Sequence, residues 1–386
     1  MTQRDVRGVN SPYLDASRDV AKGPLLGSPN KLKLAVFCAN VQRGTTGSTV
    51  DETLRVTWDD VSRIARAVDA SGIEAIIPLA QWKLVVHTAP ETERVLETFT
   101  WASAIAAITE RVQILATCHI PLYHPVMAAK AVATVDHVSG GRFGLNVVAG
   151  WNSHDFAMFG YDQHEHDDRY RAAGEWMRFI ERIWTDHKPF DFEGDYYKSR
   201  GVVSEPKPIQ SPRPVIMSAG FSPAGQKFAQ RWADLNFVSV QDVEQAALAV
   251  AAARKAARED HDRDIMMCCG GWIVCRDSEK EAREYVDYVI RERGDRITAE
   301  GQLGEMIPNS HSIRGLARDG LLERLMSGFF GLPFIGTPDQ IVDQMQRVSR
   351  AGIDGLAISW VDYDQGLAQY RDQLLPRMIQ AGLRVQ

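Results

Sequence analysis

The chain has 386 residues, 45% of them hydrophobic and 24% charged, with 50 acidic against 44 basic residues. This composition excludes collagen-like and disordered chains, and the length allows one large α/β domain or two to three average ones. The sequence has no apolar run long enough to span a membrane, no apolar signal core at its start and no Lys/Arg block typical of nucleic-acid binding. We therefore expect a cytoplasmic protein whose partner is a small molecule.

The five cysteines do not form the pattern of a disulfide framework or a zinc site. They are an odd number, at positions 38, 118, 268, 269 and 275, and most of them stand in apolar runs. This arrangement predicts reduced, buried thiols. The cluster HEHDD at residues 164–168 is too tightly bunched for all its ligands to reach one ion, so we predict no metal site.

Residues 1–30 are polar and rich in Gly, Pro and Ser, which predicts an extended N-terminal arm. Short apolar runs then alternate with longer amphipathic stretches, the pattern of βα units around a parallel sheet. The expected strands are residues 31–38, 73–79, 112–117, 143–148, 214–218, 235–240, 266–275 and 355–360. The expected helices are residues 58–70, 96–108, 125–138, 169–185, 245–258, 278–293, 338–351 and 367–381.

Eight strands with intervening helices predict a (β/α)8 TIM barrel over residues 31–386. Residues 294–333 carry several glycines and weak periodicity, which indicates an insertion before strand eight. A doubly wound open sheet is the alternative fold. It usually needs a G-x-G-x-x-G fingerprint after the first strand, and residues 40–44 (NVQRG) do not supply one.

Function in such a barrel concentrates where the strands run into the loops that follow them. Asn146 stands inside an apolar strand, where it is either a satisfied core amide or a group that hydrogen-bonds a planar heterocycle. Trp82 and Trp151 follow strands two and four, as core aromatics or as walls for a flat ligand. His119 and His124 follow strand three, as satisfied loop histidines or as groups that orient a substrate.

The stretch SAGFSP at residues 218–223 precedes a helix and is typical of a phosphate site. Its small residues let backbone N–H groups approach an anion, and the helix N-terminus adds partial positive charge. Ser222 is equally compatible with an ordinary helix N-cap. Arg169 and Tyr170 open the fourth helix, either as a surface pair or as groups that meet the same phosphate.

Three stretches resemble the bacterial luciferase-like flavin monooxygenases: ATVDHVSGGRFGLNVVAGW at 133–151, DRY at 168–170 and SAGFSPAG at 218–225. The resemblance extends roughly over residues 32–380 and is strongest to the pyrimidine oxygenase and dimethyl-sulfone monooxygenase subgroup. It implies a barrel that binds reduced FMN at the strand C-termini and uses O2 as co-substrate. A separate NAD(P)H-dependent flavin reductase would supply the reduced flavin, and the chain would form a homodimer or homotetramer.

The resemblance also assigns the flavin contacts. Trp82 and Lys83 would lie along the flavin, and Asp155 would keep a carboxylate in the flavin site. Arg169 and Tyr170 would approach the phosphate or the ribityl chain. Gly220 and Ser222 would cap the phosphate.

The same resemblance places Thr117, Asn146 and Trp151 around an oxygen pocket. Asn146 would bond the isoalloxazine, and with Thr117 it would orient O2 over flavin N5. Hydrogen bonds from both would stabilise the developing charge of a flavin N5-peroxide or N5-oxide, where luciferase itself uses a C4a-hydroperoxide.

A nucleophilic oxidant of this kind suits a small electrophilic substrate, with a nitrogen heterocycle or cyclic amide expected first and a sulfone or halo-aromatic as the alternative. His119, His124 and Trp360 are expected at the substrate end. Residues 85–91 and 294–333 differ from the pyrimidine oxygenase, which disfavours uracil itself. Two alternatives of another class are a deazaflavin-dependent dehydrogenase on the same barrel and a non-catalytic flavin-binding barrel.

Overall fold

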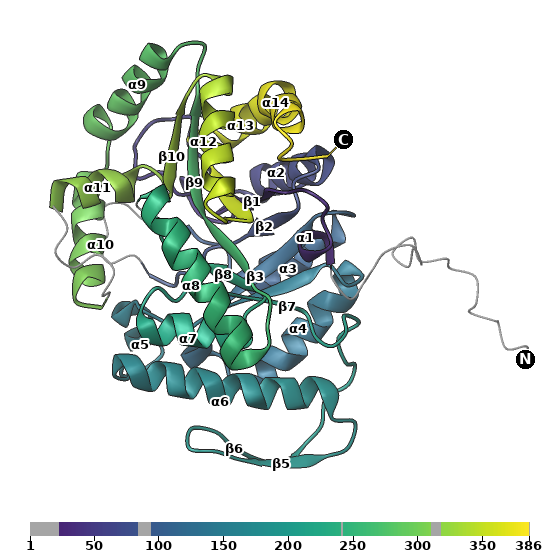
Figure 1. The fold of residues 1–386 in the computed structure, drawn as a ribbon. Helices are drawn as coiled ribbons and strands as arrows, with labels where there is room; N and C mark the ends of the chain where they lie inside the picture. The colour runs from purple at the N-terminus through teal and green to yellow at the C-terminus, as the bar shows by residue number, and fades with distance from the viewer. Residues whose placement is uncertain (1–22, 84–93, 241, 310–317, 386) are drawn as a thin grey trace, which may run out of the picture.

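The computed structural model shows a closed barrel of parallel strands surrounded by helices (Figure 1). The structure describes residues 23–83, 94–240, 242–309 and 318–385. Within these ranges the barrel strands are β1 (Lys33–Phe37), β2 (Ala75–Ile77), β3 (Gln113–His119), β4 (Phe143–Val148), β7 (Val215–Ser218), β8 (Leu235–Phe237), β9 (Met266–Cys275) and β11 (Gly355–Ser359). Each strand pairs in parallel with the next, and β11 pairs with β1. The predicted (β/α)8 barrel is confirmed.

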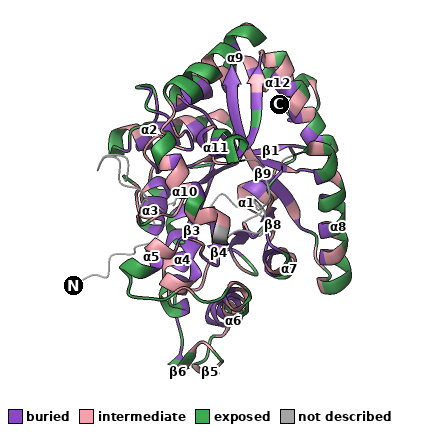
Figure 2. Ribbon diagram, turned by 90° about the vertical axis from the view of Figure 1, so that its left-hand side faces the viewer, coloured by how far each residue is buried: buried purple, intermediate pink, exposed green. Residues whose placement is uncertain are grey.

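Helices cover the outside of this barrel, with their inner faces buried and their outer faces exposed (Figure 2). They are α2 (Trp58–Ser71), α3 (Thr98–Ala107), α4 (Pro125–Ser139), α6 (His166–Thr185), α7 (Pro223–Trp232), α8 (Val243–His261), α9 (Glu279–Asp287), α12 (Pro338–Arg350), α13 (Tyr363–Gln369) and α14 (Leu375–Gln380). Helix α2 shows how the sequence sets their limits. The Thr57 side chain accepts a hydrogen bond from Asp60 N–H at its start, and Gly72 ends it in the left-handed conformation.

Three features differ from the expected elements. A two-stranded antiparallel hairpin, β5 (Phe190–Glu193) with β6 (Lys198–Val202), follows α6 and was not predicted. The short helix α5 (Ser153–Met158) follows β4. The expected helices at 278–293 and 367–381 each contain a π-helical turn, at Tyr288–Glu292 and Tyr370–Leu374.

The insertion before the last barrel strand consists of α10 (Arg296–Asn309), α11 (Arg318–Met326) and β10 (Leu332–Gly336). Strand β10 pairs with the second half of β9, from Leu332 beside Gly271 to Gly336 beside Cys275. The first half of β9 pairs with β8 as far as Cys268. The first half of β9 thus belongs to the barrel, and its second half pairs with the insertion. This pairing holds the insertion at the C-terminal rim of the barrel.

Only the last residues of the expected N-terminal arm, 23–30, are described, and part of them is helical rather than extended. Residues Gly23–Leu26 form the short helix α1, and the Leu25 N–H donates to Gln113 Oε1 over 3.0 Å. Leu25 is buried among barrel-interior residues such as Ala75 and Leu115. The part of the arm that the structure describes therefore closes the N-terminal end of the barrel, and residues 1–22 lie outside the described residues.

The same end of the barrel holds a buried ion pair. Arg384 Nη1 lies 2.9 Å from Glu74 Oε2, and the side chains are 3% and 5% exposed. Replacing Arg384 with methionine leaves Glu74 as an uncompensated buried charge, so we expect a loss of about 3–5 kcal/mol in the free energy of unfolding. Denaturant titration measures this loss. The control, Arg371→Met, removes a solvent-exposed pair with Asp372 and is expected to change stability much less; equal losses for the two variants would contradict the prediction.

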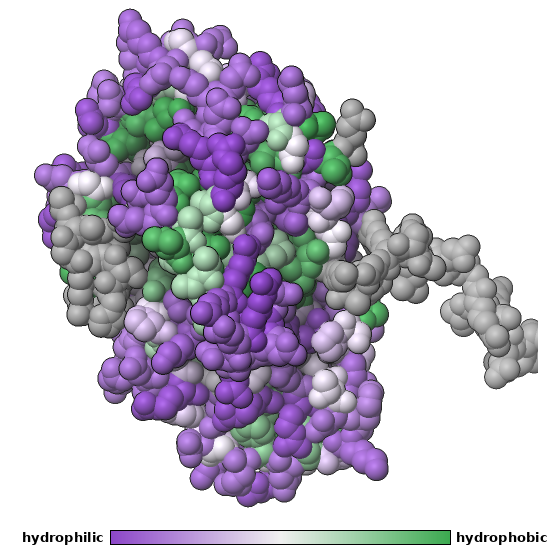
Figure 3. All heavy atoms as spheres, viewed as in Figure 1, coloured by the Kyte–Doolittle hydropathy of each residue, from purple (hydrophilic) through white to green (hydrophobic). Residues whose placement is uncertain are grey.

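The face of the molecule in Figure 3 is mostly hydrophilic, with apolar residues in separate areas between polar ones. Among the described residues, no helix has both the length and the apolar character needed to cross a membrane.

Candidate functional site

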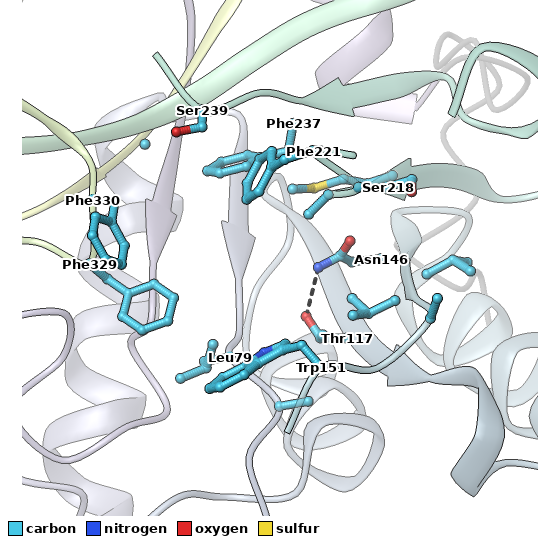
Figure 4. Close-up of a pocket in the computed structure, with 18 of the residues that line it drawn as sticks. Leu79, Thr117, Asn146, Trp151, Ser218, Phe221, Phe237, Ser239, Phe329 and Phe330 are labelled. Carbon is cyan, nitrogen blue, oxygen red and sulfur yellow. Dashed lines mark hydrogen bonds between the residues drawn. The ribbon is translucent and has the colours of Figure 1, made fainter. Parts of the chain in front are cut away.

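A cavity lies at the C-terminal ends of the barrel strands (Figure 4). Residues at or just after the ends of several barrel strands line it, and residues from the insertion complete it. Among its lining residues are Phe37, Leu79, Thr117, His119, Asn146, Trp151, Tyr170, Ser218, Gly220, Phe221, Ser222, Phe237, Ser239, Phe329 and Phe330. The polar ends of the third, fourth and fifth barrel strands (β3, β4 and β7) thus meet at one cavity.

A hydrogen-bond relay fixes the orientation of the Asn146 amide. The Thr117 hydroxyl donates its single hydrogen to the Pro78 carbonyl oxygen over 2.6 Å. Its oxygen can then only accept from Asn146, whose Nδ2 lies 3.1 Å away (Figure 4). Asn146 lines the cavity, and its Oδ1 atom is buried with no hydrogen-bond partner among the described residues. A buried unpaired acceptor is costly, and an N–H group of a bound ligand would satisfy it.

The relay bears on the oxygen pocket expected from the resemblance. Thr117, Asn146 and Trp151 do line one cavity, as expected. The Thr117 hydroxyl hydrogen is already donated to Pro78, whereas Asn146 Nδ2 has a second hydrogen that Thr117 does not use. In this arrangement Thr117 positions the amide, and Asn146 is the one of the two with a hydrogen left to donate to a ligand.

The predicted phosphate site has the geometry of a helix start. The Ser222 side chain accepts from Gly225 N–H over 3.1 Å, so Ser222 is the N-cap of α7. The Tyr170 hydroxyl also hydrogen-bonds the Ser222 side chain, and burial raises the pKa of Tyr170. Ser222 is therefore an ordinary N-cap that also lines the cavity beside Tyr170, and its contact with a phosphate stays a prediction.

Two glycines bring the backbone of this site into close contact. A Cβ atom placed on Gly220 would lie 2.6 Å from the Gly225 Cα atom. The Gly220 carbonyl oxygen accepts from Gln226 Nε2 over 2.7 Å, and Gln226 in turn accepts from Asn236. The 218–222 loop is thereby fixed against the first turn of α7, where backbone N–H groups favour an anion.

Asp155 does not line the cavity but organises the loop after β2. Its Oδ1 atom accepts from the backbone N–H groups of Trp82 (3.1 Å) and Lys83 (3.0 Å). Its Oδ2 atom lies 3.7 Å from His119 Nδ1. Burial raises the pKa of Asp155, and the two backbone N–H groups oppose this rise. Asp155 thus links the loop that carries Trp82 and Lys83 to a histidine that lines the cavity.

Burial lowers the pKa of His119 from 6.5 to about 4. As the pH falls below about 6.5, the unfolded chain binds this proton before the folded protein does, so stability is lost between about pH 6.5 and pH 4. We expect a loss of roughly 2–3 kcal/mol over this window. His119→Gln should remove this part of the pH dependence, which denaturant titrations at pH 7 and pH 4.5 measure. The pKa of Asp155 shifts in the opposite sense, and Asp155 is present in both proteins. If wild type and His119→Gln lost the same free energy of unfolding between pH 7 and pH 4.5, the assignment to His119 would be contradicted.

Several predicted site residues lie outside the cavity lining. Arg169 is buried and donates to the Gly150 carbonyl oxygen, which excludes the surface arginine weighed from the sequence. His124 is the N-cap of α4, packed beside Phe179 and Tyr197. The lining also lacks Trp82, which packs edge-on against Phe159, and Lys83 and Trp360. Trp360 is buried beside Tyr363. Direct flavin or substrate contacts of these residues stay predictions.

Sequence reasoning missed much of the aromatic lining. Phe37 and Phe237 end β1 and β8, so the rule that function gathers at strand ends was sufficient to find them. Phe221 stands inside the predicted phosphate stretch. Phe329 and Phe330 come from the insertion, and no periodic signal marks them.

Comparisons with known proteins agree with this geometry. The family model described as luciferase-like monooxygenase matches residues 32–355. The FMNH2-dependent dimethylsulfone monooxygenase of Pseudomonas putida is 29% identical over 354 residues, which cover 89% of this chain and 94% of the relative. The pyrimidine monooxygenase RutA of Enterobacter cloacae is 28% identical over 293 residues, covering 73% and 78%. A solved riboflavin lyase, RcaE, has a TM-score of 0.83 at 21% identity, covering 92% of each chain.

The structure is a (β/α)8 barrel with a cavity at the C-terminal ends of its strands. The chain belongs to the luciferase-like monooxygenase family. The resemblance inferred from the sequence motifs, including the subgroup of pyrimidine and dimethyl-sulfone oxygenases, is confirmed.

Proposed function

We propose that the protein is a two-component monooxygenase that uses reduced FMN and O2 to oxidise a small electrophilic substrate in the cavity of Figure 4. The observation that carries this proposal is the Asn146 amide that lines this cavity, whose buried Oδ1 atom has no partner in the described part of the chain. It offers an acceptor to an N–H group of a planar heterocycle such as the reduced isoalloxazine ring. A relative named for its dependence on FMNH2 supports the choice of cofactor.

The residues present fit FMN at both ends. Asn146 supplies the acceptor for the ring, while the 218–222 loop and the α7 N-terminus form a cradle for one terminal phosphate. When bound, reduced FMN supplies the electrons that activate O2. The chain's own residues position and enclose the flavin. Tyr170 and Ser222 border its phosphate end, and Trp151 and the phenylalanines of the cavity keep water away from its ring.

A flavin reductase is the partner this proposal requires. A relative named for its dependence on FMNH2 supports a flavin that is reduced by another protein before it binds. We further propose that the chain forms a homodimer or homotetramer. Light scattering at micromolar concentration tests this, and a monomer would contradict it.

Anaerobic titration with reduced FMN and reduced FAD tests the cofactor assignment. The cradle accommodates one terminal phosphate, so reduced FMN should bind more tightly than reduced FAD. Equal or tighter binding of reduced FAD would contradict the proposal. Turnover with a reduced deazaflavin in the absence of O2 would favour the dehydrogenase alternative instead.

A further inference from the structure

Two consecutive phenylalanines hold an unfavourable backbone conformation beside the cavity. Phe329 and Phe330 lie in the loop between α11 and β10, with φ angles of 53° and 65°. Bulky L-residues rarely adopt this left-handed conformation, which glycine adopts freely. Strained backbone of this kind persists only where the surrounding structure enforces it, and it is concentrated at active sites and ligand-binding sites. The loop therefore holds these two rings at a conformational free-energy cost that glycine at the same positions would avoid.

Specific contacts hold the loop in place. The N–H groups of Phe329 and Phe330 donate to the Leu325 and Arg324 carbonyl oxygens over 3.1 and 3.0 Å. The Arg324 guanidinium donates in turn to the carbonyl oxygens of Val240 and Phe330.

Glycines at both ends of the loop let it pack directly on β9. A Cβ atom on Gly328 would lie 2.5 Å from the Trp272 Cβ atom, and one on Gly331 would lie 3.2 Å from the Gly270 carbonyl carbon. The loop is thus a preformed part of the cavity wall.

The two rings face the polar end of the cavity. Figure 4 shows Phe329 and Phe330 on one side and the Asn146–Thr117 pair on the other, with Trp151 between them at the cavity edge. Both phenylalanines line the cavity, together with Trp151. A ligand held between the amide and this wall would meet aromatic surface on its far side.

We propose that Phe329 and Phe330 contact the substrate and determine specificity, selecting a substrate with a flat aromatic or heteroaromatic ring next to the group that is oxidised. This inference rests on the proposed function, because the amide side of the cavity is assigned there to the flavin. Aromatic rings attract one another through offset or edge-on contacts. A substrate as small as dimethyl sulfone would leave much of this wall without contact.

Calorimetric titration with a matched pair of probes tests the inference. Methyl phenyl sulfone and dimethyl sulfone differ by one ring in place of one methyl group. The FMN-loaded protein should bind methyl phenyl sulfone at least about 10-fold more tightly than dimethyl sulfone. The variants Phe329→Ala and Phe330→Ala should each reduce this preference about 2- to 10-fold. Equal affinities for the two sulfones, or an unchanged preference in both variants, would overturn the inference.

Glycine variants separate contact from backbone effects. Phe329→Gly and Phe330→Gly remove the ring but suit the left-handed conformation, so they should fold at least as stably as the alanine variants and lose the same preference. A loss confined to the alanine variants would assign the effect to the backbone and overturn the inference. The affinity for reduced FMN is measured first under anaerobic conditions, and the flavin-free protein is titrated in parallel. Failure of reduced FMN to bind contradicts the proposed function, whereas the phenyl preference of the flavin-free protein still tests the wall.

Discussion

Replacing Asn146 with alanine is expected to lower coupled product formation by about 100- to 1,000-fold, the usual effect of removing one hydrogen-bonding group from a site of developing charge. The reason is geometric, because the relay through Thr117 and Pro78 holds this amide so that Nδ2 keeps a second hydrogen to donate to the developing charge. The affinity for reduced FMN should change much less, since the phosphate cradle is untouched. Oxygen uptake and product yield, measured at saturating flavin, separate the two effects.

Variants of Thr117 provide matched controls. Thr117→Ser keeps the hydroxyl that accepts from Asn146 and should remain near the wild-type rate. Thr117→Val keeps the shape of the side chain, removes the acceptor and frees the amide to rotate, so its rate should fall between those of wild type and Asn146→Ala. If Asn146→Ala formed product at the full wild-type rate and coupling, the role assigned to Asn146 would be wrong.

Replacing Gly220 with alanine is expected to weaken binding of reduced FMN by about 10-fold or more, the equivalent of about one lost charge-assisted hydrogen bond. The added Cβ atom would lie 2.6 Å from the Gly225 Cα atom, so the backbone of the cradle must shift. Anaerobic titration of reduced FMN measures the change. The maximal rate at saturating flavin should be largely retained.

Gly304 offers a control for the same chemical change. It lies in α10, and a Cβ atom placed on it meets no atom within 4 Å. Gly304→Ala should bind reduced FMN as the wild type does and be slightly more stable, because alanine favours helix. Equal flavin affinity in Gly220→Ala and wild type would show that the cradle does not hold the cofactor.

The sequence predicted the barrel because its strands are short apolar runs buried on both faces. Strand β3, whose seven residues are all buried, shows why this signal is strong. The β5–β6 hairpin was missed because its strands are mostly solvent-facing, so no apolar run marks them. Strand β10 was missed because it pairs only with the outer half of β9, and its Pro333 is typical of an edge.

The candidate site was predictable where chemistry is tied to strand ends. Asn146 is a polar residue in an apolar strand, and Ser222 precedes a helix, so both can be recognised from the sequence alone. Phe329 and Phe330 do not, because their place in the cavity depends on where the insertion folds back against β9. Arg169 shows what the sequence leaves open: its position suits a surface residue or a phosphate ligand, and its side chain is buried against the Gly150 carbonyl oxygen, while contact with a phosphate stays a prediction.

The most direct test of the central claim is the fate of oxygen. Once a substrate has been found, turnover with FMN, NADH, a flavin reductase and 18O2 should give product that carries one 18O atom, and omission of the reductase or of O2 should abolish the product. Product formed without O2, or product that contains no 18O while flavin-dependent turnover persists, would contradict a monooxygenase at this cavity.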